Sequence, residues 1–354
     1  MTCAILYNPG HNRVYFETSL NLSESEFAIV SGGLSFACEN IRRENICGAE
    51  YLLFDINAPG AALSEEDAAL LYKLSFAYAV FTVEKFGGET YLKPVNKTFA
   101  PFVDESLGVI LKYPGKTNEL FTRMMLNIAC GAGGMKDGVR LLDPVAGKGT
   151  TLYEGLIRGF DVYGIEIADV VVDEARAFVK RFMENARYKF DYSSIKVSGE
   201  NKSFKAVRHT FAVAMTKEDF KSGAVKTVEF VAGNSAYADK YYRKNFFDII
   251  AGDLPYGVQH GNVTNRKQSS LTRNPSELLA ACLPSWAAVL KPGGVMILSW
   301  NKNVLPREKM TELLTGHGLA PRDGPEYLRL AHRVDQSVMR DVVVVTKAAG
   351  RDKF

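Results

Sequence analysis

Apolar residues in the first hundred positions form short, irregularly spaced runs that polar residues separate. The clearest runs are Cys3–Tyr7, Val14–Phe16, Phe27–Val30 and Tyr51–Ile56. The stretch 93–106 then mixes prolines with charged residues, which is typical of a connecting loop. We therefore predict a small α+β domain over residues 1–107, followed by a new strand at Gly108–Tyr113.

The most apolar segment of the chain, Ala68–Val83, contains Lys73 and is shorter than the roughly 20 residues that a membrane-spanning helix needs. We interpret this segment as a buried helix. Ser64 is placed to act as its N-cap, and Asp67 stands at the capping-box position three residues later. No membrane segment is expected, and the first residues lack the charged start and apolar run of a secretory signal.

From Lys116 the pattern becomes regular, because apolar runs of strand length alternate with longer segments of helical period. The predicted helices lie at 118–130, from 150 onward, and at 169–187, 276–290 and 307–317. One predicted strand ends at about 141–143, and the others span 161–165, 228–232, 247–251, 295–300 and 342–346. The segment Tyr327–Leu330 is a candidate hairpin partner of the last strand. This alternation predicts a parallel, Rossmann-like α/β sheet in a second domain, residues 108–354.

One connection in the second domain is out of proportion. About 40 residues, an insertion at about 188–226, separate a predicted helix from the strand at Val228, where such links usually take roughly 2 to 6 residues. Its apolar residues suggest a β-hairpin and include Ile195, Val197, Phe211 and Val213. Counted from Arg187, the insertion holds 9 Lys+Arg against 4 Asp+Glu, so it is either a solvated surface arm or a basic arm that grips a phosphate backbone.

Cysteine usage and charge distribution indicate the cellular compartment and the kind of binding partner to expect. The five cysteines are scattered without a CxxC pair or a histidine at ligand spacing, so we expect no disulfide framework, no metal site and a cytoplasmic location. Charge is unevenly distributed: residues 1–115 hold 8 Lys+Arg against 14 Asp+Glu, or −6, and residues 116–354 hold 35 against 26, or +9. A nucleic-acid-binding surface is therefore expected in the second domain rather than in the first.

A glycine turn joins a strand to a helix in the stretch Leu141–Gly155, LLDPVAGKGTTLYEG. Gly147 and Gly149 allow a tight turn and let the backbone approach a ligand closely. A dinucleotide-binding motif needs a third glycine where Leu152 stands, which argues against a dehydrogenase. The stretch Gly115-Lys116-Thr117 does not complete a P-loop, because the first glycine of that motif is missing.

Residues on successive strand ends suggest a nucleoside ligand with an amino-acid tail. Asp143 can face the ammonium group of a ligand, or it can simply cap the turn. Glu166 can accept hydrogen bonds from both ribose hydroxyls, or it can simply be solvated. S-adenosylmethionine, which joins adenosine to methionine, matches this set of residues on successive strand ends. Ile167 can press on the face of its adenine. The candidate cofactor-binding residues are Asp143, Gly147, Gly149, Thr150, Glu166, Ile167, Asn234 and Ser235, of which the last two can read the adenine edge.

The candidate catalytic residues are Asp253, Leu254, Pro255 and Tyr256, which follow a predicted strand. A planar amine nitrogen is a poor nucleophile because its lone pair is delocalised into the ring. Hydrogen bonds to Asp253 and to the Leu254 carbonyl can hold such an amine in line with a methyl donor, and positioning of this kind contributes about 7 to 11 kcal/mol. Tyr256 can stack on the base for roughly 1 to 3 kcal/mol. The alternative is a proline turn that ends the strand beside a surface aromatic residue.

These motifs make the chain similar to class I S-adenosylmethionine-dependent methyltransferases. Within that class it resembles the THUMP-associated tRNA guanine-N2-methyltransferases of the Trm-eleven type. The resemblance covers about residues 110–346 and rests on Lys112–Asn118 before a helix, on DPVAGKGTT with Glu166, and on DLPYG. It implies a seven-stranded sheet with a reversed last strand, a cofactor over the carboxyl ends of the first half of the sheet, and an exocyclic base amine as methyl acceptor.

Three departures from the family pattern bear on which substrate is expected. Leu254 replaces a proline, Asn234 replaces an acidic residue, and the first domain is acidic and short for an RNA-binding domain of the family. We expect methylation of an exocyclic base amine, guanine N2 in tRNA or other structured RNA. A DNA adenine-N6 methyltransferase and a non-catalytic, cofactor-binding adaptor are the alternatives, and residues 1–107 are a candidate site for RNA or a protein partner.

Overall fold

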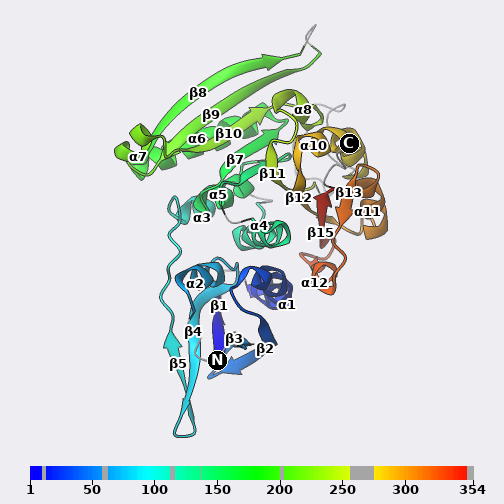
Figure 1. Ribbon diagram of the computed structural model, residues 1–354. Coiled ribbons are helices and arrows are strands. Elements are labelled where there is room, and N and C mark those ends of the chain that lie inside the picture. Colours follow the sequence, from blue (N-terminus) through cyan, green and yellow to red (C-terminus); the bar gives the residue numbers. More distant parts are fainter. Residues whose placement is uncertain are drawn as a thin grey trace, which may run out of the picture.

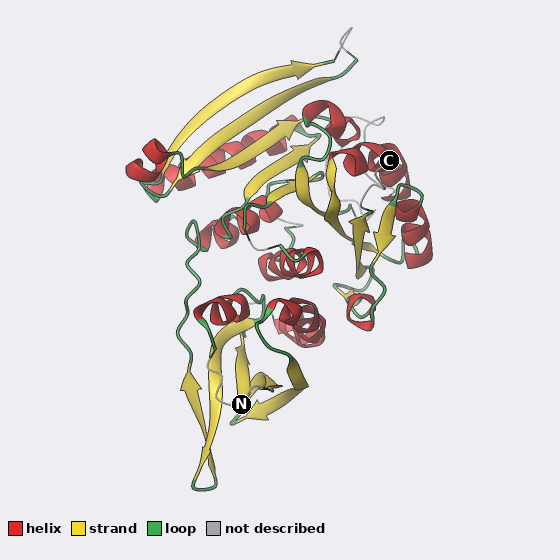
Figure 2. Cartoon of the chain, viewed as in Figure 1, coloured by secondary structure: helices red, strands yellow, loops and turns green. Residues whose placement is uncertain are grey.

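The computed structural model (Figure 1) describes residues 1–9, 13–57, 63–111, 116–135, 137–199, 203–255 and 275–348. These residues form a five-stranded sheet and a ten-stranded sheet. Figure 2 shows the two sheets toward opposite ends of the molecule, with helices between them. Of the helices in the described ranges, none is both long enough and apolar enough to span a membrane.

The smaller sheet is antiparallel throughout, with the order β2-β3-β1-β4-β5. Its strands are β1 Thr2–Tyr7, β2 Cys38–Ile46, β3 Ala49–Ile56, β4 Ala77–Phe86 and β5 Glu89–Pro94. The helices of this region are α1 Arg13–Val30, the 3₁₀ turn η1 Ser31–Gly33 and α2 Glu65–Tyr72. Apolar residues of α1 and α2 pack against the sheet, so the predicted α+β character of this region is confirmed.

The predicted helix over Ala68–Val83 is wrong in its second half. Ser64 does cap α2, because the Asp67 amide donates a hydrogen bond to the Ser64 hydroxyl (3.0 Å). The helix nevertheless ends at Tyr72, and the chain enters β4 five residues later. Aromatic and β-branched residues are frequent in β4, and they favour the strand that pairs with β1 and β5.

The larger sheet has the order β13-β15-β12-β11-β6-β7-β10-β9-β8, with β14 paired to β15. Its strands are β6 Arg140–Asp143, β7 Asp161–Glu166, β8 Lys189–Ser198, β9 Lys205–Ala214, β10 Lys226–Ala232, β11 Phe247–Asp253, β12 Leu290–Asn301, β13 Leu319–Pro321, β14 His332–Arg333 and β15 Met339–Lys347. In the spatial order β10-β7-β6-β11-β12, each strand is parallel to its neighbours. Strand β15 is antiparallel to both β12 and β13. This confirms the predicted Rossmann-like sheet with one reversed strand, which the insertion hairpin β8–β9 extends beyond β10.

Side chains alternate between two cores on the two faces of the larger sheet. Leu141 and Ile249 face one core with α4, α5 and α6, whereas Leu142 and Ile250 face the other core with α10 and α11. The long helices are α4 Glu119–Gly133, α5 Thr150–Ile157, α6 Asp169–Asn185, α10 Pro275–Val289 and α11 Arg307–Thr315, close to their predicted positions. The short helical elements are α7 Lys217–Ser222, η3 Ser235–Tyr237 and α8 Ala238–Tyr241.

Two predicted strands are helical. The segment Gly108–Tyr113 begins in helix α3 Ser106–Ile110, whose Leu107 is fully buried, and residues 112–115 lie outside the described ranges. The segment Tyr327–Leu330 begins in helix α12 Pro325–Leu328. The partner of β15 on this side is β14, so the hairpin forms a few residues later than predicted.

A buried polar network joins the two sheets through α1 and α4. The carboxylate of Glu26 on α1 accepts hydrogen bonds from the Ser75 amide (2.8 Å) and from the Asn127 side chain of α4 (2.5 Å). Full burial raises the pKa of Glu26, while these donors lower it. Because its partners come from both regions, this network holds α1 next to α4, whose N-terminal end lies at the site described below.

Candidate active site

The glycine turn has the predicted geometry at the carboxyl end of β6. Gly147 and Gly149 both adopt positive φ, +51° and +93°, and α5 begins at Thr150. A Cβ on Gly149 would lie 3.1 Å from Phe230 and from Tyr153, whereas a Cβ on Gly147 would meet nothing within 4 Å. Gly149 therefore packs the turn against the core, and Gly147 leaves open space in which a ligand can approach the main chain.

Glu166 ends β7 beside this turn and is held by main-chain donors. Its carboxylate accepts hydrogen bonds from the Gly147 amide (3.1 Å) and from the Ala168 amide (2.9 Å). Burial raises the pKa of Glu166, and the two amides act in the opposite direction. Sequence reasoning placed this side chain correctly next to the turn, and the structure adds that it also braces Gly147.

A cavity of about 240 Å³ brings the candidate cofactor-binding and catalytic residues together. Its lining includes Glu166, Ile167, Asn234, Ser235, Asp253 and Pro255, together with apolar side chains from β7, from α10 and from the two residues that follow β6. The Asn234 side chain caps η3 by accepting from the Ala236 amide (2.9 Å), and the Ser235 hydroxyl accepts from the Trp286 indole (2.9 Å). An apolar cavity whose lining includes carboxylates and an amide fits a nucleoside, whose faces are apolar and whose edges are polar.

Asp143 lies beneath the turn rather than in the cavity lining. Its side chain is only 3% exposed, and its carboxylate accepts from the Val145 amide (3.0 Å) and from the Thr151 hydroxyl. Burial, with a smaller effect of the nearby carboxylates of Asp253 and Glu166, raises the pKa of Asp143 to about 7, although the hydrogen bonds from Thr151 and Val145 act in the opposite direction. Asp143 therefore shapes the turn from below, where its charge still acts on the cavity.

We expect the pKa of Asp143 to make cofactor binding pH-dependent. With a pKa of about 7 in the ligand-free protein, Asp143 is largely protonated at pH 6 and largely ionised at pH 8. A cationic ligand favours the ionised form, so the affinity for S-adenosylmethionine should rise by up to about tenfold per pH unit below pH 7 and then level off. Calorimetric titrations of the wild type and of Asp143→Asn between pH 5.5 and 8 test this. An equal slope in both proteins would assign the dependence to another group.

The carboxylate of Asp253 is fixed by three side chains that sequence reasoning missed. Its Oδ2 accepts from the Thr117 hydroxyl (2.6 Å) and pairs with the Arg340 guanidinium (3.6 Å), while its Oδ1 accepts from the Ser299 hydroxyl. Ser299 stands directly opposite Asp253 in the parallel register of β11 and β12, and Arg340 is the second residue of the reversed strand β15. Strand order would have revealed Ser299, whereas Thr117 lies in the stretch Lys112–Asn118, which was noted for the family resemblance and for an incomplete P-loop but not for a contact with Asp253.

The main chain after Asp253 is also fixed. The Leu254 amide donates to the Ser299 carbonyl (2.8 Å), and the Leu254 side chain is 1% exposed within the core that α10 covers. Burial of leucine thus supplies part of the rigidity that a proline would give at this position. Tyr256 lies outside the described residues. Among the described residues, no cluster of three or more His, Cys, Asp or Glu side chains could hold a metal ion.

The strand order, the glycine turn and the cavity over the carboxyl ends of the strands define a class I methyltransferase, whose methyl donor is S-adenosylmethionine. Residues 111–317 match the protein family described as "RMKL-like, methyltransferase domain", so the chain belongs to that family. No curated protein matches the chain.

Among solved structures, three methyltransferases are similar to parts of this chain. They are the rRNA methyltransferase aviRa of Streptomyces viridochromogenes (14% identity, 70% of this chain, 94% of that chain, TM-score 0.40), an S-adenosylmethionine-dependent methyltransferase of Clostridium acetobutylicum (13%, 69%, 96%, 0.39) and the Burkholderia thailandensis 1,6-didemethyltoxoflavin-N1-methyltransferase with S-adenosylhomocysteine bound (16%, 65%, 80%, 0.38). At these identities and TM-scores the three structures carry no argument about this chain, and the methyl acceptor has to be inferred from its own residues.

Proposed function

We propose that this methyltransferase acts on an exocyclic base amine, guanine N2, in tRNA or another structured RNA. The observation that carries the proposal is the position of the Asp253 carboxylate. It borders the cavity that we assign to the cofactor. Three side chains hold it in place: Thr117 just before α4, Ser299 on β12 and Arg340 on β15. Because Asp253 borders this cavity, its carboxylate is placed to accept a hydrogen bond from a substrate amine there.

The proposed chemistry relies on orientation. S-adenosylmethionine supplies a methyl group on a positively charged sulfur, ready for in-line transfer. Asp253 and the Leu254 carbonyl accept the two N–H groups of the amine, which directs the nitrogen lone pair out of conjugation and toward the donor. Once the nitrogen–methyl bond has formed, the amine carries an excess proton, which Asp253 is placed to accept.

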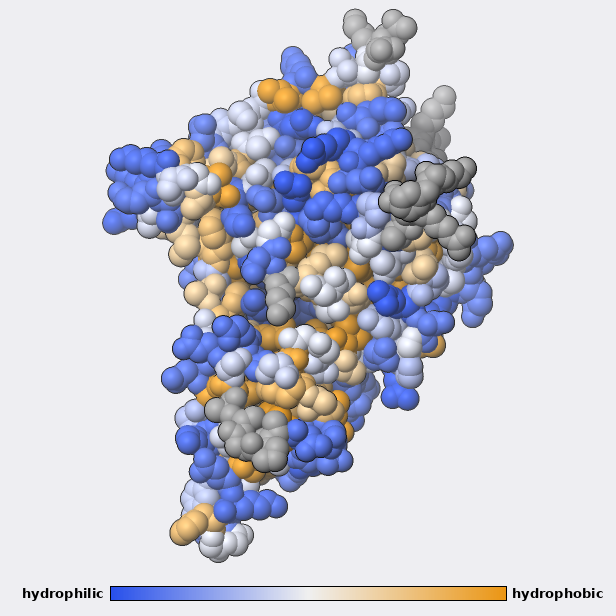
Figure 3. All heavy atoms as spheres, in the orientation of Figure 1, coloured by the Kyte–Doolittle hydropathy of each residue, from blue (hydrophilic) through white to orange (hydrophobic). Residues whose placement is uncertain are grey.

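Exposed basic residues on the insertion hairpin β8–β9 and in the segments directly beside it support an RNA substrate. Six of them are exposed and form no ion pair with a described residue: Arg187, Lys189, Lys196, Lys205, Lys217 and Lys221. Figure 3 shows a strongly hydrophilic surface at the α7 end of the hairpin. The hairpin is not a loose arm, because β9 pairs with β10 along seven residues and buries Phe211 and Val213 in the core. It therefore presents its charges from a rigid sheet edge.

We expect removal of hairpin charges to weaken RNA binding without unfolding the protein. Lys196→Gln combined with Lys205→Gln should reduce the slope of log K against log salt by about 1.4 to 1.8, since each phosphate contact contributes roughly 0.7 to 0.9. The matched control is Lys85→Gln combined with Lys309→Gln, which removes two exposed charges elsewhere. Fluorescence anisotropy with tRNA at several salt concentrations measures both. Equal slopes for the two double variants would exclude the hairpin as the RNA-binding surface.

The decisive experiment for the function uses labelled S-adenosylmethionine. The protein is incubated separately with total tRNA, ribosomal RNA and genomic DNA, and each product is digested to nucleosides. N2-methylguanosine from tRNA is the expected result. N6-methyladenine in DNA would replace the proposal with the DNA methyltransferase alternative, and cofactor binding without any transfer would favour a non-catalytic adaptor.

The first region enters the proposal as a recognition domain. We propose that residues 1–107 form a separate domain that contacts RNA or a protein partner, while residues 108–354 carry out the transfer. The five-stranded sheet has its own core, and its α1 reaches the methyltransferase sheet beside α4. A domain in this position can take part in substrate selection.

A further inference from the structure

Two polar residues that follow β10, Asn234 and Ser235, line the cavity of about 240 Å³ that we assign to the cofactor. Ile165, Ile167 and three residues of α10 supply apolar parts of the lining, which suit the face of a flat ring. Glu166 is assigned to the ribose. We therefore assign the polar edge of the adenine ring to Asn234 and Ser235.

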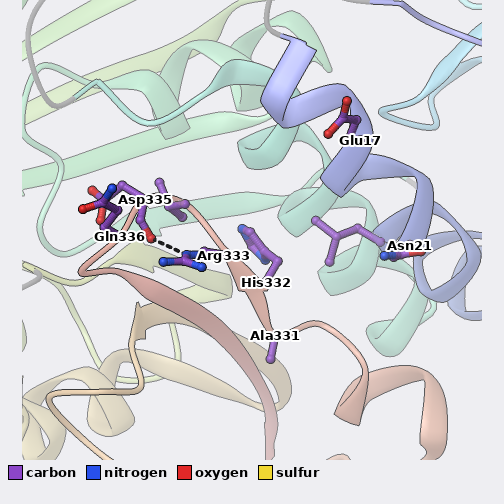
Figure 4. Close-up of a pocket in the computed structure, with 9 residues that line it drawn as sticks. Glu17, Asn21, Ala331, His332, Arg333, Asp335 and Gln336 are labelled. Carbon is purple, nitrogen blue, oxygen red and sulfur yellow. Dashed lines mark hydrogen bonds between the residues drawn. The ribbon is translucent and has the colours of Figure 1, made fainter.

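A different cavity, of about 500 Å³, lies between α1 and the turn that joins β14 to β15 (Figure 4). It shares no lining residue with the cofactor cavity, and its polar side chains include Glu17 and Asp335. The glycine turn and Glu166, which we assign to the amino-acid tail and the ribose, do not line it. Adenine is therefore placed in the cavity beside β10.

The side chain of Asn234 has a fixed orientation. It is half-buried, and its Oδ1 accepts from the Ala236 amide (2.9 Å) as the N-cap of η3. A main-chain N–H can only donate, so the atom that faces it must be the oxygen of the side-chain amide and not the nitrogen. The Nδ2 group carries two N–H donors and has no acceptor among the described residues. It is the part of Asn234 that remains for a ligand.

Trp286 fixes the hydroxyl of Ser235 in the same sense. The indole N–H of Trp286, a fully buried residue of α10, donates to the Ser235 Oγ (2.9 Å). An indole nitrogen cannot accept, so the Ser235 oxygen is the acceptor of this hydrogen bond and its own proton stays available. Within the described part of the chain, no group accepts that proton. Ser235 is therefore a donor toward a ligand in the cavity that it lines.

We propose that this site recognises the adenine of the cofactor through its ring nitrogens and not through its exocyclic amine, and that Asn234 determines this preference. The ring nitrogens of adenine accept hydrogen bonds, whereas the amine donates. Donors at Asn234 and Ser235 pair with a ring nitrogen and oppose the amine. An aspartate at position 234 would reverse the preference, because a carboxylate only accepts.

Analogues of S-adenosylhomocysteine, the cofactor without its methyl group, test this proposal by calorimetry. The purine analogue lacks only the amine, and the 1-deaza, 3-deaza and 7-deaza analogues each replace one ring nitrogen with C–H. The purine analogue should bind within about threefold of S-adenosylhomocysteine, and at least one deaza analogue at least about fivefold more weakly, since a donor would lose its acceptor. A loss for the purine analogue as large as the greatest deaza loss, or equal affinities for all analogues, would overturn the proposal.

Asn234→Asp exchanges the donor for an acceptor without a change of size. Its carboxylate can still accept from the Ala236 amide, so η3 keeps its cap. The purine analogue should now bind at least about fivefold more weakly than S-adenosylhomocysteine, the reverse of the wild-type pattern. An unchanged pattern in this variant would contradict the role of Asn234.

The matched control is Asn45→Asp, at an exposed asparagine of the first region whose side chain also accepts from a main-chain amide, that of Gly48 (3.0 Å). It adds the same charge far along the chain from the cavity and should keep the wild-type pattern. None of these measurements involves RNA. Failure of the proposal would therefore leave the proposed function standing, and the nucleoside assay tests that function separately.

Discussion

Replacing Asp253 with alanine is expected to lower kcat for methyl transfer by about 10²- to 10³-fold, the usual effect of losing one preorganised hydrogen bond to a reacting group. Asp253 ends β11 with its carboxylate held by Thr117, Ser299 and Arg340, so the group is fixed before substrate arrives. Cofactor affinity should change by no more than a few fold, because the other residues that line the cavity remain. Single-turnover rates with bound RNA, together with calorimetry for the cofactor, separate the two effects.

The matched control for this substitution lies at the other end of the same strand. Asp248 is the second residue of β11 and accepts from the Arg140 amide (2.9 Å) and from the Lys291 ammonium (2.5 Å), so Asp248→Ala also removes a partnered carboxylate. We expect Asp248→Ala to lower the melting temperature and leave kcat unchanged. If both variants lost activity equally, Asp253 would have a structural role only, and the amine mechanism would be wrong.

Arg340 complicates the Asp253 variant in a way that can be measured. It is only 6% exposed, and Asp253→Ala takes away a carboxylate that faces its charge. Part of any loss could then reflect a displaced Arg340 rather than a missing acceptor. Asp253→Asn keeps the size of the side chain and an oxygen acceptor, so activity between that of the alanine variant and the wild type is expected if orientation of the amine is what Asp253 provides.

The candidate site was largely predictable because of a topological rule. The carboxyl ends of parallel strands meet at one edge of a sheet, so Glu166 on β7, Asn234 after β10 and Asp253 on β11 could be placed together without knowledge of their contacts. The glycine turn was predictable for a local reason, since both glycines adopt positive φ. These features depend on periodicity and chain direction, which a sequence carries.

The groups that orient Asp253 were not predictable in the same way. Arg340 reaches Asp253 only because β15 runs antiparallel to β12, which places the start of β15 at the edge where β11 ends. The helix predicted over Ala68–Val83 was partly wrong for a related reason, since a continuous apolar run is compatible with either a helix or a strand. Pairing of β4 with β1 decides that case, and such pairing is a tertiary effect.

Replacing Glu166 with alanine is expected to weaken S-adenosylmethionine binding by about 10- to 100-fold, since a hydrogen bond to a charged group contributes roughly 1.5 to 3 kcal/mol. Two causes act in the same direction. The variant loses the carboxylate proposed to hold the ribose hydroxyls, and it leaves the Gly147 and Ala168 amides without their acceptor, so the turn is less well fixed. Because the assay needs only the cofactor, it is independent of the RNA hypothesis.

Asp161 provides the control, because it starts the strand that Glu166 ends. Its carboxylate accepts from the Thr227 amide (2.7 Å) at the edge of the sheet away from the cavity. Asp161→Ala should therefore destabilise the sheet without changing the cofactor Kd. Glu166→Gln separates the two causes: its amide can still accept from one of the two main-chain donors but not from both, so an affinity between those of Glu166→Ala and the wild type is expected. A wild-type Kd in Glu166→Ala would mean that the ribose is held by other residues, and that Glu166 serves only to brace Gly147.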